Sequence, residues 1–207
     1  MNNKIEGIIH RPFAPPIGKY ELSKKSIEYI NKYVDDTRKD KKQMNEKNHG
    51  GKLAGEITHE ILLSEDFNYY KDLIQELAKF VHNYIKSAID KEITKFNIKE
   101  GWVVCQYEND YNPVHWHSGH ISGVAYLKIP KNFGDSLKKE NRNGRIAFIH
   151  GSRQFLSKSS IEFTPSIGDL YLFPSYLMHS VYPFKSSQER RSFAFNAHVD
   201  EEMVYKI

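Results

Sequence analysis

Histidines are the residues of this sequence with the clearest potential for metal chemistry. The 207-residue chain has 10 of them, and His115, His117 and His120 fall within six residues. On a β-strand, residues i and i+2 point to the same side, so His115 and His117 could converge on one metal ion. The pair is a weak signal alone and needs a third ligand. His179 is the best candidate, because it begins a new strand-like run after the apolar strand and turn at Pro174.

A second motif, RRSFAFN at residues 190–196, could bind an anion. Strand alternation places Arg190 and Ser192 on one face, with small Ala194 beside them, and Arg191 on the other face. Arg190 could offer a pair of N–H donors to a carboxylate, and Ser192 adds a hydroxyl group. If the strand lines a barrel, this face leaves space for a small ligand. The alternative is a surface arginine on an edge strand.

These motifs follow one another in a fairly specific order. In sequence they are Tyr107-(x7)-His115-x-His117, then SGVAYL at 122–127, then FPS at 173–175 with His179, and then Glu189-Arg190-x-Ser192. In this order the chain resembles the iron(II)/2-oxoglutarate-dependent oxygenase superfamily. It is most similar to the prolyl-4-hydroxylase-like branch and to small oxygenases of phages and bacteria. The resemblance covers roughly residues 100–198.

The resemblance implies a fold, a reaction and a set of site residues. The fold is a double-stranded β-helix of two facing antiparallel sheets. The reaction couples oxidative decarboxylation of 2-oxoglutarate to hydroxylation of a primary substrate that is either a small molecule or a protein side chain. Dioxygen and 2-oxoglutarate are the partners, and iron(II) is the metal. The metal ligands are His115 and His179. The co-substrate residues are Arg190, which pairs with the distal carboxylate, Ser192, Tyr126 and Tyr107.

His117 departs from the pattern of the superfamily, which usually has Asp or Glu at this position. Iron(II) with two histidines and a carboxylate carries a net charge of +1, whereas three neutral histidines leave +2, which a dianionic co-substrate neutralises. Imidazole is a suitable ligand for iron, so a site of three histidines can still bind the metal. The i+2 spacing favours His117 as the third ligand, and Asp110 or His120 could replace it if the strand is bulged.

The remaining sequence predicts the elements that hold these residues. A helix begins near Ser23, a good N-cap, and a strongly amphipathic helix spans residues 66–93. A short strand is expected at 4–10. Seven further strands are expected near 102–108, 121–129, 144–150, 160–163, 169–173, 179–184 and 190–199. The fold class is α+β, a jelly-roll barrel with N-terminal helices packed on one sheet. No linker interrupts the chain, so 1–207 is one domain, with a helical support region at 1–100 and the β-helix core at 101–199.

Charge and composition argue against several classes of protein. The net charge is +4, and the segment 38–52, with six basic and two acidic residues, accounts for all of it. A localised basic segment does not favour nucleic-acid binding, which needs basic residues spread along a face. We expect a mobile loop here, which is a lid, a contact for an acidic partner or a disordered segment. No apolar stretch is long enough to span a membrane. With one cysteine, Cys105, inside an apolar run, and no signal-peptide pattern, we expect a cytoplasmic protein.

Two other functions fit the same residues. A cupin-type metal protein shares the barrel and often an HxH pair, but cupins usually add a Glu a few residues later, and residues 118–122 (SGHIS) contain none. A β module with incidental histidines and no catalytic activity is the second alternative.

Overall fold

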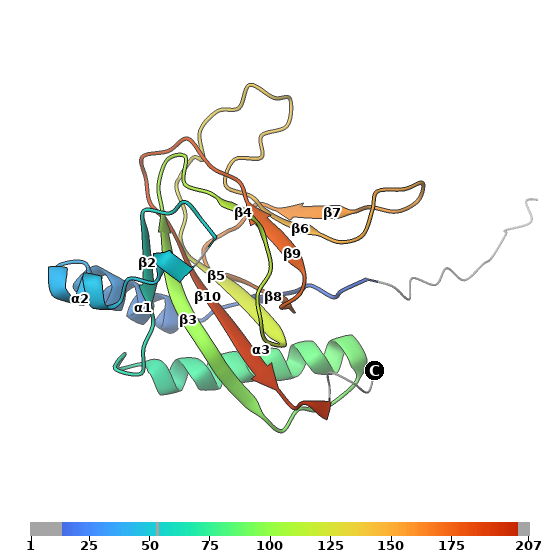
Figure 1. The fold of residues 1–207 in the computed structure, drawn as a ribbon, viewed down its shortest axis with the longest axis horizontal. Helices are drawn as coiled ribbons and strands as arrows, with labels where there is room; N and C mark the ends of the chain where they lie inside the picture. The colour runs from blue at the N-terminus through green and yellow to red at the C-terminus, as the bar shows by residue number, and fades with distance from the viewer. Residues whose placement is uncertain (1–13, 53, 203–207) are drawn as a thin grey trace, which may run out of the picture.

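The computed structural model describes residues 14–52 and 54–202, and its helices precede most of its strands (Figure 1). The expected strand at 4–10 lies outside these residues. The helices are α1 (Lys24–Thr37), α2 (Lys41–Glu46) and α3 (Tyr70–Ile89), with a short 3-10 turn at Gly50–Lys52. The strands are β1 (Gly18–Glu21), β2 (His59–Leu62), β3 (Phe96–Gln106), β4 (Asn112–His115), β5 (Ile121–Lys128), β6 (Ile146–Ile149), β7 (Ser160–Phe163), β8 (Asp169–Pro174), β9 (Met178–Val181) and β10 (Arg190–Val199).

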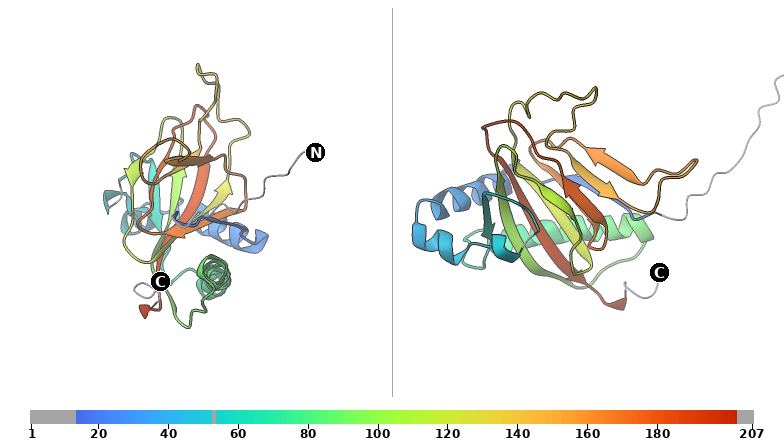
Figure 2. Two further views of the ribbon diagram at one scale, coloured as in Figure 1. Left: turned by 90° about the vertical axis from the view of Figure 1, so that its right-hand side faces the viewer. Right: turned by 45° about the horizontal axis from the view of Figure 1, so that its top comes forward.

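The strands form two antiparallel sheets. The larger sheet has the order β1-β8-β5-β10-β3-β2, and the smaller sheet has the order β4-β9-β6-β7. Figure 2 shows the small sheet set against one face of the large sheet. Most neighbouring strands are not consecutive in the sequence, and the long strand β10 lies between β3 and β5. The pairs β2–β3 and β6–β7 are the consecutive ones.

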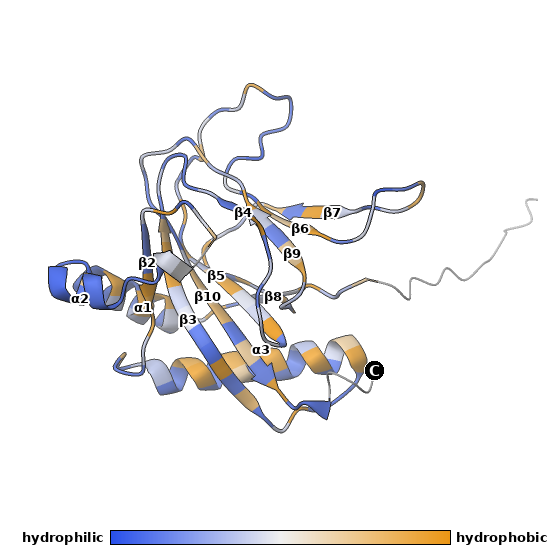
Figure 3. Cartoon of the chain, in the orientation of Figure 1, coloured by the Kyte–Doolittle hydropathy of each residue, from blue (hydrophilic) through white to orange (hydrophobic). Residues whose placement is uncertain are grey.

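Both long helices contribute to a hydrophobic cluster that also contains the outer face of the large sheet. The cluster joins Val34 of α1 and Leu77 of α3 to Val103, Cys105 and Phe193 of the sheet. Cys105 is therefore buried, as its apolar neighbours predicted. Figure 3 shows the alternating apolar and polar bands of α3, which match its buried positions at three- and four-residue spacing.

The start of α1 is fixed by its predicted cap. Ser23 accepts a hydrogen bond from the backbone N–H of Ser26 through its hydroxyl oxygen. Glu76 of α3 accepts from both the backbone N–H and the hydroxyl of Ser23, at 2.8 and 3.0 Å. This carboxylate therefore links the N-terminus of α1 to α3.

Several predicted boundaries were wrong. The segment 38–52 is not a mobile loop: it contains α2, which Asp40 caps, and the 3-10 turn. The helix expected at 66–93 is shorter, and it ends at Asp90, which adopts the left-handed conformation that terminates helices. The strand expected from 102 begins at Phe96, and β1, β2 and β4 were not predicted. No helix in the described part of the chain has the length and apolar character needed to cross a membrane.

Candidate metal centre

Three histidines converge between the two sheets. His115 ends β4 and lies opposite His179 of β9 in the strand register, and His117 follows two residues later. The ring centroids are 4.2 Å apart for His115 and His179, 4.9 Å for His115 and His117, and 5.1 Å for His117 and His179. One nitrogen of each ring lies within 4.8 Å of the others. The end of β4, the segment that follows it and β9 thus each contribute one imidazole to the same site.

Backbone hydrogen bonds orient these rings. Nδ1 of His115 lies 2.7 Å from the carbonyl oxygen of Pro113, and Nδ1 of His179 lies 3.0 Å from that of Leu177. Only a protonated Nδ1 can donate to a carbonyl, so each ring keeps the lone pair of Nε2 for a metal. The backbone N–H of His117 donates to the carbonyl of Ser175 at 2.9 Å, which fixes the chain beyond β4.

The electrostatic environment keeps these imidazoles neutral. Burial, and secondarily the proximity of His115, lower the pKa of His179 to about 3 and that of His117 to about 4. Burial also lowers the pKa of His115 below its ordinary value. Metal ligation requires the neutral form of imidazole, so all three rings are in the ligating form at neutral pH.

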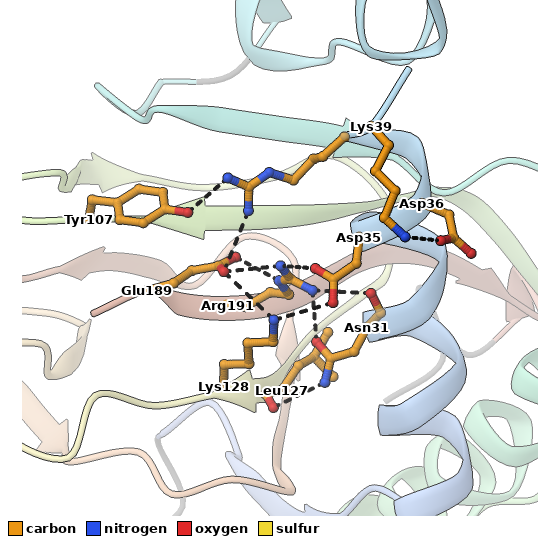
Figure 4. A network of polar contacts seen from close by, with 10 residues as sticks. Asn31, Asp35, Asp36, Lys39, Tyr107, Leu127, Lys128, Glu189 and Arg191 are labelled. Atoms are coloured by element: carbon orange, nitrogen blue, oxygen red, sulfur yellow. Dashed lines mark hydrogen bonds and ion pairs between the residues drawn. The ribbon is translucent and has the colours of Figure 1, made fainter. Parts of the chain in front are cut away.

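A cavity between the sheets connects the histidines to β10. Its lining comprises Trp102, Val104, Asn112, His115, His117, Ser122, Gly123, Val124, Ile146, Phe173, His179, Val181, Arg190, Ser192, Ala194 and Phe195. The predicted alternation of β10 is therefore observed: Arg190, Ser192 and Ala194 face the cavity. Arg191 faces α1 instead, where it forms ion pairs with Asp35 and Glu189 (Figure 4).

Arg190 is almost completely buried, and its hydrogen-bonding capacity is only partly used. Its Nη1 donates to the carbonyl of Gly144 at 3.0 Å, whereas Nε has no partner among the described residues. Gly144 has a φ of 70°, in the left-handed region that favours glycine, which turns this carbonyl toward the arginine. Burial lowers the pKa of Arg190, and no carboxylate contributes to that shift.

Tyr126 lies beside Arg190 and also has a buried polar atom without a hydrogen-bond partner among the described residues. The guanidinium carbon of Arg190 is 5.3 Å from the centroid of the Tyr126 ring, and the tyrosine hydroxyl is buried without a partner among the described residues. Ser192 is adjacent, since it is the cross-strand neighbour of Tyr126 in the sheet. Buried donors without acceptors cost free energy, which an anionic ligand at this position would recover.

The structure does not bring Tyr107 to the cavity. Its hydroxyl accepts a hydrogen bond from Arg38 at 3.0 Å, within the polar network between α1 and the large sheet (Figure 4). The two reserve ligands are also engaged elsewhere. His120 accepts from the backbone N–H of Val199 through Nδ1, and Asp110 accepts from Thr58 and from the backbone N–H of Tyr107.

Sequence reasoning missed residues that lie next to the histidines. The Trp102 ring is 5.5 Å from that of His117, and Val104 and Asn112 line the same cavity. Period-2 alternation along β3 could have placed Trp102, Val104 and Gln106 on one face, but nothing local showed that this face was the inner one. Glu60 of β2, cross-strand from Val104, was missed because its strand was not predicted.

Comparison with known proteins identifies this arrangement. Residues 100–196 match the family model described as "Putative 2OG-Fe(II) oxygenase", where 2OG is 2-oxoglutarate. No curated protein sequence matches the chain.

Solved structures with low sequence identity share the fold. AviO1 from Streptomyces viridochromogenes has a TM-score of 0.59 and 13% identity, covering 90% of both chains. The viral collagen prolyl hydroxylase of Paramecium bursaria Chlorella virus-1, solved with 2-oxoglutarate, has a TM-score of 0.55 and 16% identity, covering 87% of this chain and 94% of its own. HygX from Streptomyces hygroscopicus, solved with iron, has a TM-score of 0.52 and 11% identity, covering 87% and 81%.

The two sheets are therefore similar to the double-stranded β-helix of these oxygenases. The expected resemblance is confirmed where the motifs lie: residues 100–196 match the model of a 2OG-Fe(II) oxygenase family, and the structures that share the fold include a prolyl hydroxylase solved with 2-oxoglutarate and HygX solved with iron.

Proposed function

We propose that this chain hydroxylates a primary substrate, with iron(II) bound by His115, His117 and His179 and 2-oxoglutarate bound at Arg190. The observation that carries the proposal is a pair of buried donors that have no partner among the described residues: Nε of Arg190, which lines the cavity with the three histidines, and Oη of Tyr126, which lies beside Arg190 on β5. These donors suit the distal carboxylate of the co-substrate.

The histidine cluster fits iron(II) by the chemistry of its donors. The three nitrogens come from neutral, oriented imidazoles, and imidazole is a good ligand for iron. His115, His117 and His179 would hold the metal. When bound, iron(II) would supply the oxidative decarboxylation of 2-oxoglutarate to succinate and carbon dioxide, coupled to insertion of one oxygen atom of dioxygen into a C–H bond of the substrate.

The protein residues bind and orient the co-substrate. Arg190 is held in place by Gly144, so its remaining N–H donors are preorganised to receive a carboxylate. Ser192 adds a hydroxyl from the same face of β10, and Tyr126 adds a second one behind the guanidinium group. Because Arg190 is buried, its ion pair with a carboxylate is protected from water.

The rest of the cavity wall keeps water away from the reacting groups. Phe173 lies 4.9 Å from the ring of His179, and Ile146 and Val181 line the cavity beside it. An apolar wall next to the metal ligands limits side reactions of a strong oxidant with water and polar side chains.

An anaerobic titration tests this proposal. Adding 2-oxoglutarate to the iron(II)-loaded protein is expected to produce the metal-to-ligand charge-transfer absorption of a chelated 2-oxo acid. Arg190→Ala should raise the 2-oxoglutarate concentration needed for the band by at least about 100-fold, since a charge-assisted bidentate pair is lost, while iron binding persists. The control Arg153→Ala, at an exposed arginine, should match the wild type. A folded, iron-loaded wild-type protein without the band would support a cupin-like or non-catalytic function instead.

A further inference from the structure

A second group of buried polar atoms without partners lies on the β2 side of the barrel, and these atoms are acceptors. Glu60 of β2 is only 3% exposed, and its Oε1 has no hydrogen-bond partner among the described residues. Its other oxygen lies under the 3-10 turn, 3.3 Å from the position of a Cβ built on Gly50. Native proteins rarely bury a carboxylate without a partner, because the desolvation cost is large.

The register of the large sheet places Glu60 next to the cavity. Glu60 is the cross-strand neighbour of Val104, which in turn neighbours Ser192, and both Val104 and Ser192 line the cavity. Directly paired residues have Cβ atoms about 5 Å apart on the same face of a sheet. Glu60 therefore lies on the inner face, one strand beyond the cavity wall.

Gln106, two residues along β3 from Val104, has the same property. Its Nε2 donates to Asn112, which also lines the cavity, and its Oε1 has no partner among the described residues. Two acceptors thus lie on adjacent strands on the inner face, so this corner of the barrel can receive N–H donors.

No described cation compensates Glu60. Burial, and to a smaller extent the negative charge of Asp110, raise the pKa of Glu60 to about 7, and no basic group contributes to the shift. Glu100 adds a second carboxylate to the inner face of β3, four residues before Val104, where it accepts from Asn196 and lies 3.7 Å from Nε2 of His49. The β2–β3 side of the barrel is therefore acidic, whereas Arg190 supplies positive charge on β10.

We propose that the primary substrate carries a protonated nitrogen, as an alkylammonium or guanidinium group, and that Glu60 accepts its N–H donors. This inference rests on the proposed function, because Glu60 lies on the inner face of the barrel beside the cavity that would hold the metal and the co-substrate. The dianionic co-substrate pairs with Arg190 and the metal, and the cationic end of the substrate pairs with Glu60. An ion pair at a desolvated site gives specificity against neutral analogues, which leave the buried carboxyl without a partner.

Calorimetry on the full-length, iron(II)-loaded protein with saturating 2-oxoglutarate, under anaerobic conditions, tests the assignment. The probes are n-butylammonium and its neutral counterpart 1-butanol. The wild type should bind the ammonium at least 10-fold more tightly than the alcohol, and Glu60→Gln should abolish that preference. The control Glu65→Gln, at an exposed carboxylate, should retain it. The wild-type comparison needs no variant, so a folding defect in Glu60→Gln would not remove the test.

Failure of this inference can be told from failure of the proposed function. If the charge-transfer band forms but the ammonium does not bind, binds no better than the alcohol, or binds Glu60→Gln unchanged, the role of Glu60 is wrong and the oxygenase site stands. If the band does not form in the wild type, the proposed function fails and the inference fails with it.

Discussion

At the residue scale, three histidines, rather than two and a carboxylate, converge at the candidate metal centre. Their spacing was predictable, because strand alternation relates His115 to His117 locally. His179, 64 residues after His115, was the best third candidate because it begins a strand-like run after the turn at Pro174, and the resemblance of the whole motif order supported that choice. Assignment of the three as ligands remains a prediction, supported by the convergence of their nitrogens within 4.8 Å.

His179→Ala is expected to remove the metal. Loss of an outer-shell partner typically weakens metal binding by about 10- to 100-fold, and loss of a direct ligand from a set of three should exceed that range. Iron content after dialysis against a weak chelator measures the effect. His150→Ala, at an exposed histidine, should retain iron like the wild type. Full iron occupancy in His179→Ala would contradict the ligand set.

His117→Asp tests the charge of the three-histidine site. The substitution should retain iron(II) but reduce the net charge of the centre from +2 to +1. Removing one unit of attraction at about 4 Å costs at least about 1 kcal/mol even in water, or roughly fivefold in affinity for the co-substrate dianion. The midpoint of the charge-transfer titration measures this. Tighter 2-oxoglutarate binding by the variant would show that the charge argument is wrong.

The pKa of Glu60 predicts a pH-dependent stability. Between its ordinary pKa of 4.5 and its folded-state pKa of about 7, the unfolded chain releases this proton while the folded protein keeps it, so folding becomes less favourable as pH rises. Relative to Glu60→Gln, the metal-free wild type should lose about 3 kcal/mol between pH 4.5 and 8. Urea unfolding at these two pH values measures the difference. Identical pH dependence in both proteins would contradict the raised pKa.

At the scale of elements, the two adjacent arginines of β10 point to opposite faces of the large sheet. Arg190 faces the cavity, whereas Arg191 is fully buried against α1, where it donates to Asp35 and Glu189 at 2.7 Å (Figure 4). The sequence predicted this division of faces. It could not predict Asp35 as a partner, because α1 is brought to β10 only by the tertiary fold.

Arg191→Met is therefore expected to affect stability rather than co-substrate binding. Removing the buried guanidinium takes away the shortest ion pairs of Asp35 and Glu189, which keep only longer ones to Lys128 and Arg38. The loss should cost about 1–3 kcal/mol. Urea unfolding should show this loss, while the 2-oxoglutarate titration of the folded variant should remain close to that of the wild type. The opposite pattern, with stability unchanged and the co-substrate lost, would mean that the two faces of β10 have been assigned the wrong way round.

The strands that sequence analysis missed share a physical cause. β1 (GKYE), β2 (HEIL) and β4 (NPVH) have four residues each and few β-branched or aromatic side chains, whereas the equally short β6 (IAFI) and β7 (SIEF) are richer in them. The conformation of β1, β2 and β4 is imposed by pairing with β8, β3 and β9. Glu60 lies on β2 and His115 on β4. The sequence therefore did not predict the β2–β3 side of the barrel, whereas it did predict the cavity-facing residues of β10.

At the scale of the whole molecule, residues from both halves of the chain enter one hydrophobic cluster. The prediction that 1–207 is one domain, with 1–100 as support for 101–199, was made because no linker interrupts the sequence, and this shared core of described residues supports it. Thermal unfolding of the metal-free protein should then show a single cooperative transition, with calorimetric and van't Hoff enthalpies that agree. Two resolved transitions would contradict the single domain.

The account depends most on one claim, that three histidines and Arg190 hold iron(II) and 2-oxoglutarate in a single cavity. The most direct measurement is an anaerobic crystal structure with iron(II) and 2-oxoglutarate, using anomalous scattering at the iron edge. We predict one anomalous peak within coordination distance of His115, His117 and His179, and a 2-oxoglutarate whose distal carboxylate meets Arg190. An iron peak elsewhere, or a co-substrate that does not contact Arg190, would contradict the account.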